Sequence, residues 1–182
     1  MIDVRTTPLD GVLEIRSSRI GDERGFFSET WNAVAWQEAG IAVSFVQDNH
    51  SRSALGVLRG LHYQLPPSAQ VKLVRVTRGS VFDVAVDIRR ESPDFGRWFG
   101  LILSASEWNQ LLIPAGFAHG FLALEGGSEV QYKVSAPYDR AQDRAIHPLD
   151  PAIGVEWPTA IDKLWFSAKD KAAPMLADAE TF

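Results

Sequence analysis

Residues 71–88 carry the pattern that decides the fold class, and they read VKLVRVTRGSVFDVAVDI. Two runs within them, 71–78 and 81–88, are rich in apolar residues and alternate with the two-residue period of a β-strand. The Gly79-Ser80 step between the runs predicts a hairpin turn. In the second run, one face is expected to carry Phe82, Val84, Val86 and Ile88, and the other face Asp83, Ala85 and Asp87.

Short apolar runs of the same kind recur along the chain. They predict further strands at residues 55–64, 100–104, 110–113, 120–124 and 129–135. Helical signals are few: residues 32–40 can form a short helix between the N-cap Asn32 and Gly40, and residues 167–173 can form one turn before Pro174. Many short strands with little helix predict an all-β sandwich, jelly roll or small barrel, and the pattern alone does not choose among the three.

Length and composition restrict the class of protein. The 182 residues fit one domain, 1–182, without repeats or a linker. A net charge of −5 argues against a nucleic-acid partner, and no stretch approaches the ~20 apolar residues of a membrane span. The absence of cysteine excludes disulfides, thiolate metal sites and cysteine nucleophiles, and residues 1–14 show no signal-peptide pattern. A soluble, cytoplasmic protein is expected.

The four histidines are the first candidates for chemistry. His62 lies inside a predicted strand on the same face as Gly60 and Gln64, which indicates a face that looks into a cavity. Histidine is the natural general base near neutral pH, but a histidine hydrogen-bonded in a polar core is an equally open interpretation. His119 follows a turn-rich segment and, taken alone, is more often structural, while His50 and His147 are expected at the surface.

The spacing of the histidines does not predict a metal site. Many metal-binding cupins use two histidines separated by one residue, followed by a glutamate and a third histidine. Here no two histidines have that spacing, and the first carboxylate downstream of His62 is Asp83. No metal and no cofactor are therefore expected.

Three further side chains have both a structural and a chemical interpretation. Tyr132 shares its face with Val130 and Val134, so it is either a core tyrosine or a phenol that can give a proton. Lys72 would stabilise an oxyanion if it points inward rather than into solvent. Asp170 follows Ser167 by three residues, where a carboxylate commonly supports a helix N-terminus.

Several cations could bind phosphate. Arg24, Arg59 and Lys169 are the candidates, since guanidinium groups in particular hold phosphates bidentately. Neither a P-loop nor a dinucleotide fingerprint is present, so side chains would have to hold any phosphate. Taken singly, each of these charges is more often a solvated surface group.

Taken together, the ordered blocks resemble the deoxythymidine-diphosphate-4-dehydrorhamnose 3,5-epimerases. The matching blocks are GDERGFFSE (21–29), FVQDNHS (45–51), GVLRGLHYQ (56–64), KLVRV (72–76), VFDVAVDIR (81–89), IPAGFAHGF (113–121), Tyr132-Lys133, Tyr138, Trp157-Pro158 and SAKD (167–170). The match runs from about residue 20 to residue 176, which is far more specific than any single motif.

The resemblance implies a cupin-type jelly roll, a homodimer, an active site inside the barrel, and no metal. It implies His62 as the base, oriented by Asp170, with Tyr132 as the acid on the other face of the sugar and Lys72 beside the C4 oxygen. It implies a dTDP-linked 4-keto-6-deoxyhexose as the ligand. The implied ligand contacts are Arg24, Phe26, Glu29, Gln47, Asp48, Asn49, Ser51, Arg59, His119, Tyr138, Asp143 and Lys169.

The resemblance implies that different residues of that set bind different parts of the ligand. Arg24 and Glu29 would bind the nucleotide, and whether they do so across the dimer interface stays open. Tyr138 would stack on the thymine. The C4 ketone acidifies the protons on C3 and C5, so the intermediate is an enolate whose oxygen needs a cation or a donor. Inversion then requires a base on one face and an acid on the other.

Some positions depart from the family pattern. Val71 stands where glycine is usual, Asp143 replaces a glutamate, and residues 147–149 lack the usual tryptophan before Asp150-Pro151. The pair Trp165-Phe166 is also unusual before Ser167. None of these changes removes a proton-transfer residue, but they leave open which sugar is bound and whether both carbons are inverted.

The sequence leaves three alternatives to a 3,5-epimerase. The nearest is the same chemistry at one carbon, which the sequence cannot separate. A catalytically silent cupin that only binds sugar nucleotides is disfavoured, because a binder needs no acid–base pair such as His62 and Tyr132. A metal-dependent cupin oxygenase lacks the ligands.

Overall fold

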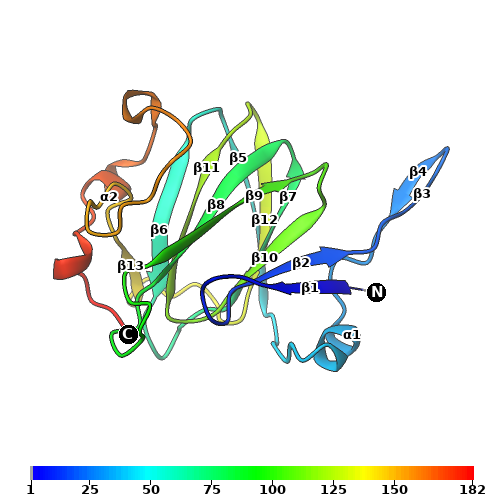
Figure 1. Ribbon diagram of the computed structural model, residues 1–182, viewed down its shortest axis with the longest axis horizontal. Helices are drawn as coiled ribbons and strands as arrows, with labels where there is room; N and C mark the ends of the chain where they lie inside the picture. Colours follow the sequence, from blue (N-terminus) through cyan, green and yellow to red (C-terminus); the bar gives the residue numbers. More distant parts are fainter. Residues whose placement is uncertain (1) are drawn as a thin grey trace.

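The computed structural model describes residues 2–182 (Figure 1). Eight successive strands in it pair in a nested order, the first with the last, the second with the one before the last, and so on. They are β5 (Gln47–Ser53), β6 (Leu58–Gln64), β7 (Lys72–Arg78), β8 (Ser80–Asp87), β9 (Trp98–Ser104), β10 (Asn109–Ile113), β11 (Phe117–Ala123) and β12 (Ser128–Val134). β5 pairs with β12, β6 with β11, β7 with β10 and β8 with β9, all antiparallel. This nested pairing is a jelly roll, so the choice that the pattern left open is settled.

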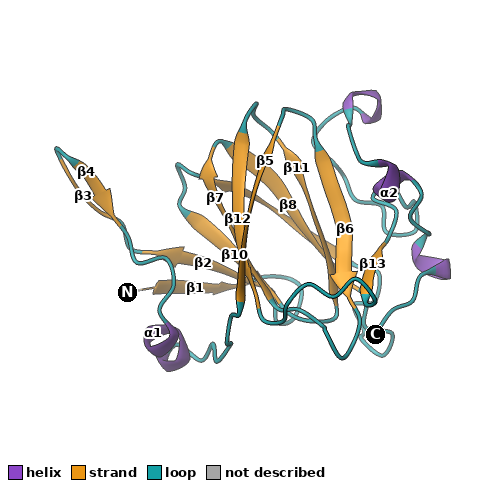
Figure 2. Ribbon diagram, turned by 180° about the vertical axis from the view of Figure 1, so that it is seen from behind, coloured by secondary structure: helices purple, strands orange, loops and turns teal. Residues whose placement is uncertain are grey.

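The strands form two sheets that face each other (Figures 1 and 2). One has the order β1-β2-β10-β7-β12-β5, with β1 at Ile2–Thr6 and β2 at Leu13–Ser17. The other has the order β13-β6-β11-β8-β9, with β13 at Asp143–Ala145. Inward side chains of both sheets, such as Val74, Val130, Ala85 and Phe121, form the core between them.

The hairpin predicted at Gly79-Ser80 is wrong. β7 pairs with β10 and β12, whereas β8 pairs with β9 and β11, so the chain crosses from one sheet to the other at this step. Only Gly79 has a positive φ (+69°), while the favoured two-residue type I′ hairpin turn needs two such residues. β8 lies between β11 and β9, so both of its edges are already paired within the five-stranded sheet and neither is left for β7.

The remaining strand predictions and the two helix predictions are confirmed within one to three residues at most ends. Asn32 caps α1 (Ala33–Glu38) by accepting from the amides of Val34 and Ala35, and Gly40 follows with φ +84°. Ser167 caps α2 (Ala168–Lys171). The strands that went unpredicted are β1 to β5 and β13, which are short or polar. Among them β1 (IDVRT) and β2 (LEIRS) do alternate, but over five residues only.

The C-terminal segment covers the outer face of the five-stranded sheet. It contains two 3-10 helices, η1 (Ile161–Lys163) and η2 (Leu176–Asp178), on either side of α2. Leu176 and Ala179 pack with Val84 and Val86 of β8, and the amide of Phe182 donates to the carbonyl of Ile88 at 3.1 Å. This packing holds α2 beside β6 (Figure 2).

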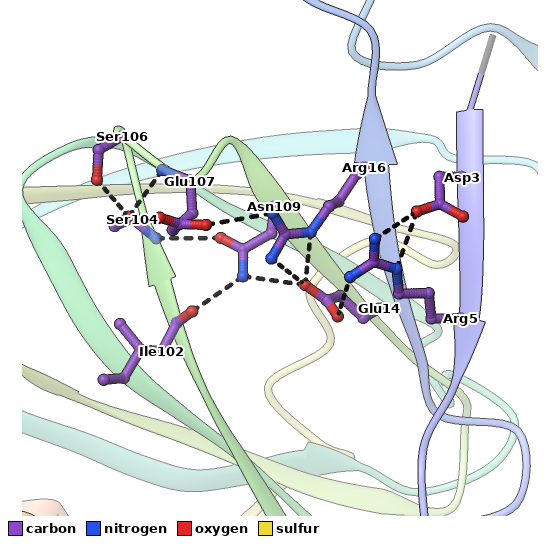
Figure 3. Close-up of polar contacts among 9 residues, drawn as sticks. All are labelled: Asp3, Arg5, Glu14, Arg16, Ile102, Ser104, Ser106, Glu107 and Asn109. Carbon is purple, nitrogen blue, oxygen red and sulfur yellow. Dashed lines mark hydrogen bonds and ion pairs between the residues drawn. The ribbon is translucent and has the colours of Figure 1, made fainter.

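The N-terminal strands extend the six-stranded sheet. Glu14 of β2 accepts from Arg16 at 3.0 Å and from the Asn109 amide at 3.4 Å, and Arg5 lies 3.8 Å away, which ties β1, β2 and β10 together (Figure 3). A hairpin of β3 (Ile20–Asp22) and β4 (Gly25–Phe27) projects away from the sandwich (Figures 1 and 2). None of the helices within residues 2–182 has the length and apolarity that crossing a bilayer would take.

Candidate active site

A cavity of about 620 Å³ lies between the two sheets. It is lined from three directions, and the inward-facing polar side chains are shared among them. The five-stranded sheet contributes Arg59, His62, Gln64, His119 and Asp143, the six-stranded sheet Ser51, Lys72 and Tyr132, and the C-terminal segment Trp165, Ser167, Lys169 and Asp170. A cavity with several convergent polar and titratable groups is the first candidate for an active site.

A β-bulge puts Arg59 and His62 on the same wall. Three residues apart, they would face opposite ways in a regular strand, but Arg59 pairs with Phe121 and His62 with His119, so β6 has one extra residue there. Gly60 sits in the bulge with φ +126°, and a Cβ on it would come within 2.5 Å of the Gly120 Cα. The expectation that Gly60 shares the cavity face with His62 and Gln64 is therefore wrong, because Gly60 turns toward β11.

His62 and Asp170 form a hydrogen-bonded pair. The His62 Nε2 lies 2.6 Å from the Asp170 Oδ1, although 108 residues separate the two in sequence. Burial opposes ionisation of Asp170, but the hydrogen bond and charge of His62 and hydrogen bonds from Ser167 outweigh it, so its pKa is lowered. The carboxylate thus occupies one ring nitrogen of His62 and leaves Nδ1 for a ligand.

Lys72 reaches His62 from the opposite sheet. Its Nζ donates to the backbone carbonyl of His62 at 3.0 Å, and the residue is only 7 % exposed. Burial lowers the pKa of Lys72 to about 8, against the opposing effect of the Asp83 and Asp143 carboxylates. The inward orientation that oxyanion stabilisation requires is therefore present.

Tyr132 also projects from the six-stranded sheet. It stands opposite Val74 of β7 and Asn49 of β5, on the inner face of β12. Burial raises the pKa of its phenol, and the positive charge of Arg59 opposes the shift. At neutral pH the phenol is protonated, so it can donate a proton into the cavity that His62 enters from the other sheet.

A second histidine–carboxylate pair lies deeper between the sheets. Both oxygens of Asp83 are 3.0 Å from the His119 Nε2, and Asp83 is fully buried. His119 is the direct cross-strand neighbour of His62, in the middle of β11 rather than in a loop. Asp83 was missed as a site residue, although an acidic residue inside an otherwise apolar buried strand was a usable signal.

Comparison with known proteins identifies the chain's relatives. The family model described as dTDP-4-dehydrorhamnose 3,5-epimerase matches residues 6–178. The chain belongs to the dTDP-4-dehydrorhamnose 3,5-epimerase family. It is 50 % identical over 182 residues to the enzyme of that name from Shigella flexneri, covering 100 % of this chain and 99 % of the relative. It is 53 % identical over 163 residues to the one from Pseudomonas aeruginosa, covering 89 % of each.

Solved structures agree with this assignment. An epimerase from Legionella pneumophila in complex with dTDP-4-keto-L-rhamnose superposes with a TM-score of 0.95 at 45 % identity, covering 99 % of this chain and 95 % of that one. A 3′-monoepimerase from Streptomyces bikiniensis in complex with dTDP-quinovose gives a TM-score of 0.87 at 32 % identity, covering 94 % and 88 %. The chain is thus an epimerase with the cupin-type jelly roll that the resemblance implied.

The epimerase carries a polar cluster at the end of β6. Asp143, paired with Gln64 across β13 and β6, accepts hydrogen bonds from the Lys169 Nζ and, at 3.2 Å, from the Tyr138 hydroxyl. All three side chains line the cavity. The shorter carboxylate at position 143 therefore still reaches its neighbours.

Strand β5 divides its four predicted contacts between two faces. Gln47, Asn49 and Ser51 alternate with Asp48, which is exposed on the outer face and bound to Lys133 at 2.6 Å. Gln47 donates to Asn49 at 2.9 Å. The Ser51 Oγ is buried at the cavity and has no hydrogen-bond partner among residues 2–182, so it is available to a ligand.

Six predicted contacts are not among the residues that line the cavity of their own chain: Gln47, Asp48 and Asn49 of β5, and Arg24, Phe26 and Glu29. Arg24 and Phe26 belong to the projecting β3–β4 hairpin, and Glu29 follows it. Arg24 binds Asp22 of the same hairpin. As for metals, no cluster of three or more histidine, cysteine or acidic side chains suited to a metal ion occurs within the described residues.

Proposed function

We propose that this epimerase inverts C3 and C5 of dTDP-4-dehydro-6-deoxy-D-glucose and gives dTDP-4-dehydro-L-rhamnose. One observation carries the proposal: His62 and Tyr132 enter the same cavity from opposite sheets, with Lys72 bound to the His62 backbone. A hexose held between the sheets presents one ring face to each of them. This is the arrangement that proton removal on one face and proton return on the other require.

The mechanism follows from the acidity of the substrate. His62, aligned by Asp170 at 2.6 Å, takes the proton from the carbon next to the C4 ketone. The electron pair moves into the C–C bond and onto the C4 oxygen, where the Lys72 ammonium stabilises the enolate. Tyr132 then returns a proton to the opposite face. Its phenolate recovers a proton from solvent, and the His62 imidazolium releases the proton that it took, so both groups are reset for the second carbon. Each positioned acid or base typically contributes ~10²–10⁴-fold.

The substrate assignment draws on the relatives and on side chains that line the cavity. The Legionella pneumophila structure holds dTDP-4-keto-L-rhamnose, and one from Bacillus anthracis holds TDP and pyrophosphate. In this chain Arg59 lines the cavity, and its Nε donates to the Ser53 hydroxyl and its Nη2 to the Arg52 carbonyl, two bonds that hold the guanidinium in place. We infer that Arg59 binds the diphosphate and that the exposed Tyr138 ring stacks on thymine.

Arg59→Ala provides a direct test of ligand binding. It should weaken binding of dTDP alone in calorimetry, because a phosphate contact acts whether or not a sugar is attached. The loss should be partly masked at high salt, where the wild-type attraction is screened. Unchanged affinity at low salt would give Arg59 a purely structural role.

We further infer that the epimerase is a homodimer in which the β3–β4 hairpin reaches the partner's cavity. The hairpin projects from the sandwich and exposes Ile20 (72 %) and Phe27 (70 %), a surface that a second copy could cover (Figure 1). It also carries Arg24 away from its own site.

Light scattering should give a dimer. Mixed dimers of Arg24→Ala and His62→Ala should regain activity, since one site then keeps both residues.

The alternative of a single-carbon epimerase is favoured by one observation, the likeness to the Streptomyces bikiniensis 3′-monoepimerase. Supplying the keto-sugar nucleotide in heavy water separates the two functions, because NMR of the product reports deuterium and configuration at each carbon. Deuterium at both C3 and C5 with inversion at both is expected. Labelling and inversion at one carbon alone would establish the alternative. If neither carbon is labelled or inverted, the protein is a sugar-nucleotide binder without epimerase activity.

A further inference from the structure

Trp165 is the large apolar residue at the rim of the cavity that the core does not use. Its side chain is 67 % exposed and lines the cavity. Its neighbours behave differently: Leu164 is buried, and Phe166 packs against the same small core cluster with Leu58 and Leu122. No aromatic or cation–π pair found within residues 2–182 involves Trp165.

The backbone of Trp165 is fixed without help from its indole. Trp165 forms a parallel bridge with Val57, in which its carbonyl accepts from Leu58 at 2.7 Å and its amide donates to Gly56 at 2.9 Å. These bonds add the segment to the start of β6. A side chain held at a fixed place, exposed and apolar, is suited to contact a ligand rather than to stabilise the fold.

Position along β6 indicates which part of the ligand Trp165 meets. Trp165 lies beside Val57 at the start of the strand, and His62 lies further along it. The Tyr138 hydroxyl binds Asp143, which pairs with Gln64 at the far end. The site of proton transfer therefore lies between the two rim aromatics. Arg59, which is proposed to bind the diphosphate, lies between Val57 and His62, so with thymine on Tyr138 both the diphosphate and the hexose lie on the side of Trp165. Of these two, the C–H surface of the hexose suits an apolar indole face and the charged diphosphate does not.

We propose that Trp165 packs against the hexose and determines specificity for it. The inference rests on the proposed function. The indole face would cover the apolar C–H surface and C6 methyl of a 6-deoxyhexose, a contact that the nucleotide does not make. Covering about half of an exposed indole corresponds to about a tenfold change in the dissociation constant.

Calorimetry with two probes tests this role. Trp165→Ala should weaken binding of dTDP-L-rhamnose about tenfold and leave that of dTDP unchanged. Trp165→Phe should restore most of the loss. Leu55→Ala is the matched control, since Leu55 is 64 % exposed just before β6 but does not line the cavity, and it should change neither affinity.

The other outcomes are distinct. Equal weakening for dTDP and dTDP-L-rhamnose would place Trp165 on the nucleotide, and no change for either would leave it a solvent-exposed residue; both overturn the proposal. Failure of the proposed ligand would instead appear in the wild-type protein as a lack of binding for both probes, and failure of the proposed reaction as a lack of epimerisation in the heavy-water experiment.

Discussion

The Lys72 ammonium of one sheet donates to the backbone carbonyl of His62 in the facing sheet at 3.0 Å. This bond crosses the cavity and fixes the cation relative to the base. A buried lysine costs free energy in the folded state, because burial disfavours its charged form. The contact therefore joins a destabilising group to the residue that its charge would assist, and this relationship leads to two predictions.

The first prediction concerns the alkaline side of the pH profile. Burial lowers the pKa of Lys72 to about 8, while the pKa of Tyr132 is raised. The value of kcat/KM should therefore fall as pH rises through about 8, because Lys72 loses its proton there and Tyr132 keeps its own. Asp143→Asn removes a charge that raises the Lys72 pKa, so it should move this limb to lower pH. If Asp143→Asn leaves the alkaline fall of kcat/KM at the same pH, the assignment of that fall to Lys72 is contradicted.

The second prediction concerns stability. The folded-state pKa of Lys72 lies below its ordinary 10.5, so the unfolded chain binds more protons between about pH 8 and 10.5, and the free energy of unfolding rises with pH in that window. Lys72→Met should remove this penalty and raise the free energy of unfolding at pH 7 by about 2 kcal/mol, net of the lost hydrogen bond. Urea titration measures it. Activity should fall by ~10²–10³-fold in the same variant.

Asp170→Asn tests the orientation of the base. The amide can present a donor to the His62 Nε2 and favour the wrong tautomer, so kcat should fall about 10²–10⁴-fold. Ser167→Ala is the control: it removes the cap of α2 at a cost of about 1 kcal/mol but leaves the carboxylate in place. Steady-state kinetics on both variants should show loss of activity in the first alone. Comparable losses would mean that Asp170 acts through the helix.

Gly60→Ala tests the bulge. A Cβ there would come 2.5 Å from the Gly120 Cα and 2.8 Å from the His119 carbonyl oxygen, at a φ of +126°. The free energy of unfolding should drop by about 3 kcal/mol, and residual folded protein should be inactive because Arg59 and His62 shift together. Gly126→Ala, with nothing within 4 Å, should alter neither stability nor activity. Denaturant titration and turnover would report both.

Local patterns predicted the elements better than their arrangement. Apolar runs and alternation located β6 to β12, and the caps Asn32 and Ser167 located both helices. The partner of each strand depends on contacts remote in sequence, and the Gly79-Ser80 step resembled a hairpin turn although it joins different sheets. Asp83 was not predicted as a site residue for the same reason, because its partner His119 is 36 residues away.

The site was located through the resemblance more than through spacing. His62, Lys72, Tyr132 and Asp170 are brought together by the fold from four separate segments. No period in the sequence relates them. Strand alternation would put Arg59 and His62 on opposite faces, and the bulge at Gly60 puts them on the same face instead. The placement of Arg24 and Phe26 on a projecting hairpin was equally invisible, since β3 and β4 are three residues each.

Exchange of the C3 and C5 protons in heavy water, followed by NMR for two variants, tests the division of roles between His62 and Tyr132. His62→Ala should abolish both exchange and inversion, because no base remains. Tyr132→Phe keeps the base and Lys72, so it should still form the enolate and return deuterium from the His62 face. That variant should wash deuterium into C3 with retained configuration and give little inverted sugar. Inversion at a near-normal rate by Tyr132→Phe, or continued exchange by His62→Ala, would contradict the mechanism.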